Sequence, residues 1–349
     1  MTPYWAKTST SSLKRMTTEQ VSGLILAAGK GTRMKSAIAK VLHEVFYAPM
    51  LHHVLDAMAP LRLERTIVII GHQHEQVEAA LRGYPVTPVV QREQLGTGHA
   101  VLCAEESLRG AGGVLLILCG DTPLIRTATL AAMLASHQEQ AMPLTVMTTT
   151  LVEPAGYGRI IRNSQGEFEK IVEEKDASSA ERRITEINAG IYCVDLPFIF
   201  NALARVGTDN NQGERYLTDI VAIARGEGRQ VNMFCCADSM EVLGVNSRLE
   251  LAEAHRQLQL RRNAELMLAG VTLLAPDTIS VQPGVTIGPD TCIHPNVHLT
   301  GSTRVGRHCI IAPNTVLHDC RIGDNVTIGP LSLLNGQELA DNTCFPPQP

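Results

Sequence analysis

The sequence predicts an α/β protein that continues into a parallel β-helix, and three features carry this prediction. Residues 21–245 alternate short apolar runs with helical stretches. Residues 247–269 form one long segment that contains neither Gly nor Pro. From residue 281 onward an aliphatic side chain recurs every six residues, with one five-residue step from Leu317 to Ile322. These patterns are typical of a mostly parallel sheet with helices on both faces, a connector helix and a stack of β-helix coils.

The apolar runs of the first region each end at a glycine or a polar residue. They cover residues 24–28, 66–70 and 114–119, and they end at Gly29, Gly71 and Gly120-Asp121. Helical stretches are predicted over residues 49–59 and 97–108. Because ligands bind beyond the carboxyl ends of strands in such sheets, these end residues are expected at one functional edge.

The first of these strand ends is rich in glycine and positive charge. Gly29 and Gly31 let the backbone N–H groups approach an anion closely, and Lys30 and Arg33 add charge. Lys40 follows an uncharged stretch, which suits a cation that points into a site. The sequence therefore predicts a phosphate-binding loop, with an ordinary strand–turn–helix junction and solvated cations as the alternative.

Further polar groups follow downstream. Asp121, directly after a strand, can hold Mg²⁺ beside a triphosphate, although a simple turn is the alternative. The segment from Gln91 to Ala100 offers an amide, two glycines and a hydroxyl that suit the edge of a pyrimidine base. Glu173 and Glu174 can read sugar hydroxyls or form a solvated face. Asn246 can serve the site or cap the following helix.

The last part of the chain carries a helix and a repeat. Ser247 and Glu250 form a capping box for a helix that ends at Gly270. The six-residue repeat predicts about three coils that extend to about residue 340, after which residues 341–349 break the pattern. Its aliphatic positions are Val281, Ile287, Ile293, Leu299, Val305, Ile311, Leu317, Ile322, Ile328 and Leu334.

Composition narrows the class of protein. The chain has 349 residues, a formal net charge of −5, 44% hydrophobic residues and 19% charged residues. These values do not suggest a nucleic-acid-binding surface, and no apolar run has the length of a membrane span. The nine cysteines include no Cys-x-x-Cys pair, and their odd number argues against a disulfide framework. Because the first 20 residues are not followed by the apolar region of a signal peptide, a cytoplasmic protein is expected. Residues 1–20, rich in Ser and Thr, are interpreted as a flexible extension.

Over residues 21–340 the chain resembles the bacterial N-acetylglucosamine-1-phosphate uridyltransferases, whose bifunctional members also carry a glucosamine-1-phosphate acetyltransferase domain. The strings LAAGKGTRM, QLGTGHA, GYGRI, EINAGI and GVNSRL carry the resemblance. It implies a Rossmann-like nucleotidyltransferase domain at 21–246, a connector helix at 247–269 and a truncated left-handed β-helix at 270–349. It also implies a homotrimer formed through the β-helix.

The resemblance also implies roles for individual residues. Arg33, Lys40 and Asp121 are expected to be catalytic, with Mg²⁺ held by Asp121 and Asn246. The residues expected to contact the nucleotide, its phosphates and the uracil are Leu26, Ala27, Ala28, Gly29, Lys40, Gln91, Gly96 and Thr97. Those expected around the amino sugar and the reacting phosphates are Cys119, Gly120, Asp121, Gly158, Glu173, Asn188 and Asn246.

Four departures from the family pattern stand out. Ala39 replaces a usual Pro, so Lys40 is expected to be less well fixed. Cys119 replaces a frequent Tyr and Ala189 a frequent Thr, which is expected to weaken contacts near the sugar. The coils and tail that hold the family's acetyltransferase site have no counterpart in this sequence.

The expected reaction converts UTP and N-acetylglucosamine 1-phosphate into UDP-N-acetylglucosamine and pyrophosphate, without acetyltransferase activity. One alternative is another sugar-nucleotide pyrophosphorylase that makes UDP-, dTDP- or ADP-glucose. A second is a catalytically silent assembly subunit, and a third is a hexapeptide acyltransferase.

Overall fold

The computed structural model describes residues 21–347, which form two compact units. One unit contains residues 21–43 and Pro49–Asn246, and the other contains Glu44–Ala48 and the chain from Ser247 onward. The extension expected at residues 1–20 lies outside the described residues. Within residues 21–347, every helix is too short or too polar to cross a bilayer.

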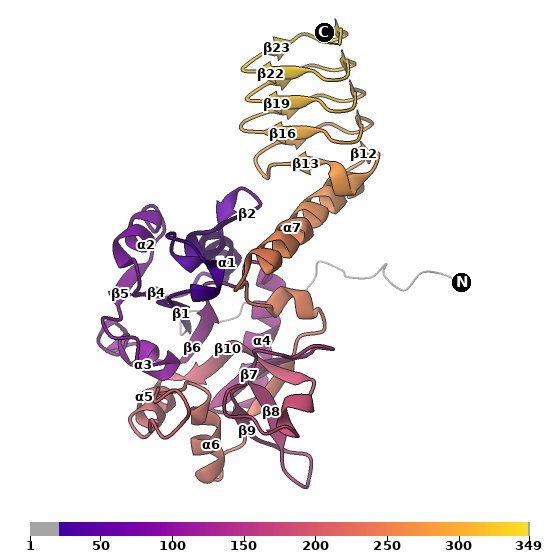
Figure 1. The fold of residues 1–349 in the computed structure, drawn as a ribbon. Coiled ribbons are helices and arrows are strands. Elements are labelled where there is room, and N and C mark those ends of the chain that lie inside the picture. Colours follow the sequence, from indigo (N-terminus) through magenta and orange to yellow (C-terminus); the bar gives the residue numbers. More distant parts are fainter. Residues whose placement is uncertain (1–20, 348–349) are drawn as a thin grey trace. The chain divides into compact units, whose positions relative to one another are not determined.

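The first unit is built on a large sheet, which has nine strands among the described residues (Figure 1). Seven strands lie in the order β11-β7-β10-β6-β1-β4-β5, and β8 and β9 branch from β10. Their bounds are β1 Val21–Ala27, β4 Arg65–Ile70, β5 Thr87–Val90, β6 Val114–Cys119, β7 Leu144–Thr150, β8 Arg159–Arg162, β9 Phe168–Val172, β10 Glu186–Asp195 and β11 Asn232–Cys235. The three strands predicted from apolar runs are β1, β4 and β6.

The pairing confirms the predicted α/β class with a largely parallel sheet. Strand β1 lies between β4 and β6 and is parallel to both, and β4–β5 and β7–β11 are also parallel. Strand β10 runs antiparallel to β6 and β7. The carboxyl ends of β1, β4 and β6 therefore meet at one edge, as the sequence predicts.

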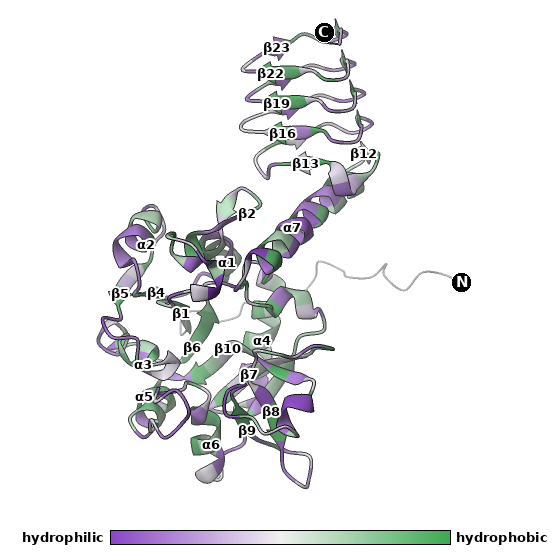
Figure 2. Ribbon diagram, in the orientation of Figure 1, coloured by the Kyte–Doolittle hydropathy of each residue, from purple (hydrophilic) through white to green (hydrophobic). Residues whose placement is uncertain are grey.

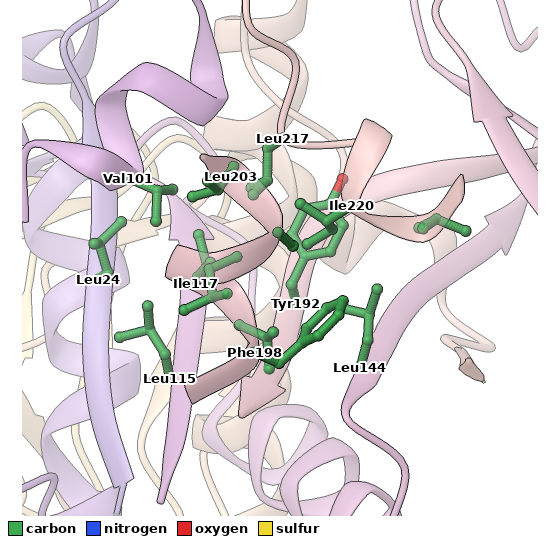
Figure 3. Packing of buried hydrophobic residues seen from close by; sticks show 14 of the residues in the cluster. Leu24, Val101, Leu115, Ile117, Leu144, Tyr192, Phe198, Leu203, Leu217 and Ile220 are labelled. Carbon is green, nitrogen blue, oxygen red and sulfur yellow. The ribbon is translucent and has the colours of Figure 1, made fainter. Parts of the chain in front are cut away.

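Helices cover both faces of this sheet. Successive side chains of a strand point to opposite faces, so Leu24 and Ile25 belong to two separate apolar clusters. Leu24 packs in the cluster that α3, α5 and α6 complete, part of which is shown in Figure 3. Ile25 packs in the cluster completed by α1, α2 and α4. Figure 2 shows the resulting hydrophobic interior at β6.

The predicted helix at 49–59 is observed as α1, Met50–Met58. The predicted helix at 97–108 is shorter, because Ala104 and Glu105 donate to carbonyls three residues back and the chain continues as tight turns. The remaining helices of the first unit are α2 His74–Ala80, α3 Thr97–Leu102, α4 Thr127–Gln140, α5 Leu196–Leu203 and α6 Asp219–Gly226. Short 3₁₀ segments are η2 Thr32–Met34, η3 Lys40–Leu42, η4 Ala59–Leu61, η5 Glu106–Leu108, η6 Glu181–Arg183 and η7 Ser239–Val242.

The second unit begins with the long helix α7, Arg248–Leu268. Its N-cap is Ser247, whose hydroxyl accepts a hydrogen bond from the Glu250 N–H at 3.3 Å, as the capping box predicts. A two-stranded hairpin, β2 Glu44–Val45 and β3 Ala48–Pro49, reaches this helix. There the Phe46 N–H donates to His255 Nδ1 at 3.1 Å.

The chain then forms a left-handed parallel β-helix, whose stacked coils are visible in Figure 1. One sheet contains β12 Thr272–Leu273, β15 Cys292–Ile293, β18 Ile310–Ile311, β21 Thr327–Ile328 and β24 Cys344–Phe345. The second contains β13 Ser280–Val281, β16 His298–Thr300, β19 Val316–His318 and β22 Leu333–Asn335. The third contains β14 Thr286–Ile287, β17 Arg304–Val305, β20 Arg321–Ile322 and β23 Glu338–Leu339.

Stacking in register buries the repeated aliphatic side chains. Ile293, Ile311 and Ile328 face one another in adjacent coils and are buried. Each sheet edge thus continues the hydrogen bonds of the previous coil while the aliphatic column excludes water.

The prediction of about three coils, from 281 to about 340, is wrong at both ends. Strand β12 already pairs with β15, but a 3₁₀ turn at Pro276–Thr278 (η8) lengthens the spacing from Leu273 to Val281 and hides the repeat. At the other end β24 pairs with β21, and Phe345 packs against the core six residues after Leu339. An aromatic side chain takes the aliphatic position there, so the aliphatic pattern breaks while the coil continues.

Candidate active site

Two adjoining cavities lie at the carboxyl edge of the large sheet. The larger, of about 530 Å³, is lined by the loop after β1, by Lys40 and by the segment around Gln91. The smaller, of about 200 Å³, is lined by the loop before β8, by Glu173 after β9, by residues of β10 and by Asn246. Four residues line both cavities: Leu26, Thr97, Cys119 and Asp121.

Most of the predicted site residues line these two cavities. The large cavity collects Leu26, Ala27, Ala28, Gly29, Lys40, Gln91, Gly96, Thr97, Cys119 and Asp121. The small cavity adds Gly158, Glu173, Asn188 and Asn246. Arg33 and Gly120 line neither cavity. Arg33 is exposed on η2, and Gly120 is buried where an added side chain would meet Ala27, Val41 and Leu51.

Lys40, Asp121 and Asn246 meet at the junction between the cavities. The Lys40 ammonium donates to Asp121 Oδ2 and to Asn246 Oδ1. The side chains of Lys40 and Asp121 are only 13% and 18% exposed. The Val245 N–H donates to the Asp121 carbonyl at 2.8 Å, which holds the two segments together. Asn246 therefore faces the site, and the cap of α7 is Ser247 instead.

This arrangement fits a divalent cation that is completed by a substrate. The Asp121 carboxylate and the Asn246 amide oxygen converge on one cation, here the Lys40 ammonium. Mg²⁺ prefers oxygen ligands and is commonly held by one or two protein groups together with phosphate oxygens and water. No group of three or more His, Cys, Asp or Glu side chains suited to a metal occurs among residues 21–347, so the phosphates would have to supply further ligands.

Ala39, the position where Pro was expected, already has a proline-like backbone. Its φ is −54° and its ψ is 136°, whereas a proline ring holds φ near −65°. The residue is 3% exposed and directly precedes Lys40. The backbone at Ala39 therefore positions Lys40 without a proline ring, and contacts with Asp121 and Asn246 help to hold the Lys40 side chain.

Ala39→Pro is therefore expected to stabilise the protein by about 0.4–1 kcal/mol, because the ring restricts the unfolded chain while fitting the native backbone. Thermal unfolding of the two proteins measures the effect, and turnover is expected to stay at the wild-type level. A lower melting temperature in the variant would contradict the backbone conformation described here.

The small cavity gathers the three residues expected around the sugar. A Cβ added to Gly158 would lie 2.9 Å from Ile171 Cγ2, 3.5 Å from Glu173 Oε2 and 3.6 Å from Asn188 Cβ. The glycine thus permits a close approach of β8 to β9 and β10 beside the cavity. Thr218 Oγ1 donates to Glu173 Oε1 at 3.0 Å, which orients this carboxylate.

Glu174, by contrast, supports the cavity wall. Its Oε2 accepts from Arg159 Nη2 at 2.7 Å and from the Gly156 N–H at 3.1 Å. Arg159 is 1% exposed. A buried guanidinium requires such a partner, so this pair fixes the loop through Gly156, Tyr157 and Gly158 that lines the cavity. The solvated face considered for both glutamates is therefore wrong for Glu174.

Burial raises the pKa of Glu173, and Asp219, Asp176 and Glu214 raise it further, against the hydrogen bond from Thr218. A carboxyl whose pKa is higher in the folded than in the unfolded state binds its proton more tightly when folded. Its contribution to stability is therefore lost as the pH rises from the pKa of the unfolded state through the higher pKa of the folded state.

Glu173→Gln is expected to raise the melting temperature by a few degrees at about pH 7.5, because it removes a buried charge but keeps an acceptor for Thr218. The difference is expected to vanish near pH 4, where the wild-type carboxyl is protonated in both states. Thermal unfolding at the two pH values measures this. Glu169→Gln, which changes an exposed carboxylate on β9, is the control, and equal effects of both variants would contradict the prediction.

Cys119 is a neutral side chain in this site. Burial, followed by the Asp121 charge, raises its pKa to about 12, so it does not supply a thiolate nucleophile. Its Sγ donates to the Gly190 carbonyl at 3.6 Å. The sulfur therefore packs against the backbone turn that follows Asn188 and Ala189.

Sequence reasoning missed the segment between α5 and α6. Gln212 and Glu214 line the large cavity, and Leu217 and Thr218 line the small one. The segment is attached to the loop around Thr97, whose Oγ1 accepts from the Leu217 N–H at 2.9 Å. Gly96 allows this approach, since a Cβ there would lie 2.4 Å from the Arg215 carbonyl oxygen. Only its polar composition distinguishes the segment, and polarity alone does not indicate where a loop returns.

Two family models match the chain. A MobA-like NTP transferase domain matches residues 23–186. A bacterial transferase hexapeptide model of six repeats matches residues 284–319 and 302–336. The first match covers the part of the large sheet from β1 to β9, and the second covers stacked coils.

Curated relatives are similar over almost the whole chain. The bifunctional protein GlmU of Geotalea uraniireducens is 46% identical over 328 residues, which are 94% of this chain and 72% of that protein. GlmU of Desulfotalea psychrophila is 46% identical over 325 residues, covering 93% of this chain and 96% of that protein. GlmU of Halalkalibacterium halodurans is 44% identical over 324 residues, with coverages of 93% and 71%.

Proposed function

The chain belongs to the GlmU family, and we propose that it transfers UMP from UTP to N-acetylglucosamine 1-phosphate, which gives UDP-N-acetylglucosamine and pyrophosphate. The chain is a nucleotidyltransferase, and residues 21–246 are assigned to this reaction. The meeting of the two cavities at Asp121, with Lys40 and Asn246 beside it, is the observation that carries the proposal.

The two cavities suit the two substrates of this reaction. The glycine-rich loop after β1, with the Gln91 amide and the backbone of Gly96, suits the nucleotide in the large cavity. Gly158, Glu173 and Asn188 suit the hydroxyl and amide groups of the sugar in the small cavity. An oxygen of the sugar phosphate can then approach the α-phosphorus of UTP at the junction.

The chemistry requires no general base, because the sugar phosphate is already an oxyanion near neutral pH. Its oxygen forms a bond to the α-phosphorus, and the bond from the α-phosphorus to the bridging oxygen breaks, so that pyrophosphate leaves with its electron pair. Lys40 compensates the charge that develops on the α-phosphate, and Arg33 compensates the charge of the pyrophosphate. Bound Mg²⁺, held by Asp121 and Asn246, would supply Lewis-acid stabilisation of the phosphate oxygens.

A pyrophosphate-release assay with UTP, N-acetylglucosamine 1-phosphate and Mg²⁺ tests the proposal. Turnover is expected with this pair of substrates. It is expected to be much lower when dTTP or ATP replaces UTP, or when glucose 1-phosphate replaces N-acetylglucosamine 1-phosphate. Turnover only with another pair would favour a different sugar-nucleotide pyrophosphorylase. Binding of UDP-N-acetylglucosamine without turnover would favour the catalytically silent subunit.

Three further expectations belong to this proposal. A homotrimer formed through the β-helix can be measured by sedimentation. The expected cytoplasmic location and the expectation of no nucleic-acid partner also stay predictions. Residues 21–246 are assigned to uridyl transfer, and none of the described residues is assigned to acetyl transfer.

A further inference from the structure

The small cavity contains a buried phenol that the proposed mechanism does not use. Tyr192 is 2% exposed and lines this cavity. Its ring packs in the apolar cluster on one face of the sheet, and the red atom in Figure 3 is its hydroxyl oxygen. A phenol buried in this way keeps a polar atom that needs a hydrogen-bond partner.

That partner is Asn188, one of the residues expected to bind the sugar. Asn188 Nδ2 donates to the Tyr192 hydroxyl at 2.6 Å, and the Gly190 N–H donates to Asn188 Oδ1 at 3.0 Å. Because a backbone N–H can only donate, Oδ1 must face Gly190, and Nδ2 then faces Tyr192. The two contacts hold the amide in one of its two possible orientations.

The local fold produces this arrangement. The pairing of β10 with β7 shifts between Asn188 and Tyr192, and Gly190 in this irregular stretch has a φ of +73°. The irregularity turns the Gly190 N–H back toward Asn188, two residues earlier. Asn188 is only 8% exposed and lines the small cavity. The amide proton and lone pair that are not used within the protein therefore face hydrogen-bond partners only in that cavity.

We propose that Tyr192 is a positioning residue for the sugar phosphate and acts through Asn188, an inference that rests on the proposed function. Each amide nitrogen carries two protons and each amide oxygen two lone pairs. One of each is used internally, which leaves one proton and one lone pair for the hydroxyl or carbonyl groups of the sugar. Without the phenol oxygen only the Gly190 N–H holds the amide, so its rotation about χ2 is less restricted and its orientation is less firmly set before the substrate binds.

The state of the phenol supports a pH-independent role. Burial raises the pKa of Tyr192 well above its usual value, and Glu173 raises it further. The side chain therefore stays a neutral hydroxyl throughout the pH range of an enzyme assay, and the orientation of Asn188 does not depend on its ionisation.

Steady-state kinetics of Tyr192→Phe test the inference, because this change removes the hydroxyl and keeps the ring. The KM for N-acetylglucosamine 1-phosphate is expected to rise about five- to tenfold, the loss typical of one neutral hydrogen bond. The KM for UTP and the kcat are expected to stay within about twofold of wild type. Tyr84→Phe is the matched control, since its hydroxyl donates to Asp56 at 3.2 Å and lines neither cavity.

Adding Tyr192→Phe to Asn188→Ala distinguishes positioning from direct contact. If Tyr192 acts through Asn188, the double variant is expected to have the same KM for the sugar phosphate as Asn188→Ala alone. A further rise in the double variant, an unchanged KM in Tyr192→Phe or equal increases for both substrates would each overturn the inference. Absence of wild-type turnover would instead defeat the proposed function, so the two failures are distinguishable.

Discussion

Asp121→Ala is expected to reduce turnover about a hundredfold or more while leaving the protein folded. Asp121 lines both cavities and contacts the Lys40 ammonium. Its loss removes the carboxylate proposed to hold Mg²⁺ and leaves a largely buried lysine with Asn246 as its remaining partner at the junction. The effect is of the size seen when a group that stabilises charge in a transition state is removed.

The measurement is kcat in the pyrophosphate-release assay at saturating substrates, with thermal unfolding measured in parallel. Asp56→Ala is a suitable control, because it removes an exposed carboxylate of the same unit that accepts a hydrogen bond from Tyr84. A folded Asp121→Ala protein with near-normal turnover would exclude the proposed metal-binding role.

Lys40→Met is expected to have an effect of similar size on turnover, about a hundredfold. Methionine keeps an unbranched side chain but removes the charge proposed to stabilise the α-phosphate. The ammonium also lies against the two oxygens proposed to hold the metal. Without it, Mg²⁺ is expected to bind more tightly in the presence of UDP-N-acetylglucosamine, as measured by calorimetry, even though turnover falls.

Arg33→Ala belongs to the same comparison, because Arg33 is proposed to act on the leaving pyrophosphate and is also expected to lower turnover about a hundredfold. Lys35→Ala is the control, since Lys35 is exposed in the same loop and lines neither cavity. Equal, small effects of Arg33→Ala and Lys35→Ala would show that Arg33 contributes only general positive charge. For Lys40→Met, weaker Mg²⁺ binding than in the wild type would contradict the expectation that the Lys40 ammonium and Mg²⁺ compete for the oxygens of Asp121 and Asn246.

Local patterns predicted three strands and two helices of the first unit, the long helix α7 and the register of the coils, but not the other strands and helices of the large sheet. The apolar runs that become β1, β4 and β6 are recognisable because each is a buried strand with a glycine or polar end. The hexapeptide register of the coils is recognisable because one aliphatic side chain is buried on each face of each coil. The coil number was underestimated because an inserted turn near Pro276 and an aromatic residue at Phe345 interrupt the pattern without interrupting the stack.

The site was predictable only in part. The residues that line the cavities were found largely because the motifs of a family name them together. The support for these residues was not found. Arg159 lies in the GYGRI string, but its burial and its pairing with Glu174 have no signal in the sequence. Tyr192, which contacts Asn188, shows no periodic or compositional signal that separates it from other strand residues.

The amino-acid sequence by itself determined the fold class, the glycine-rich loop and the helix that Ser247 caps, because each depends on residues that are neighbours in the chain. Only the tertiary structure decided which distant groups meet: Lys40 contacts Asp121 across 81 positions and Asn246 across 206. It also decided that the segment from Gln212 to Thr218 lines both cavities. Such encounters depend on strand order and on the burial of unpaired polar groups, and both arise only when the whole sheet is assembled.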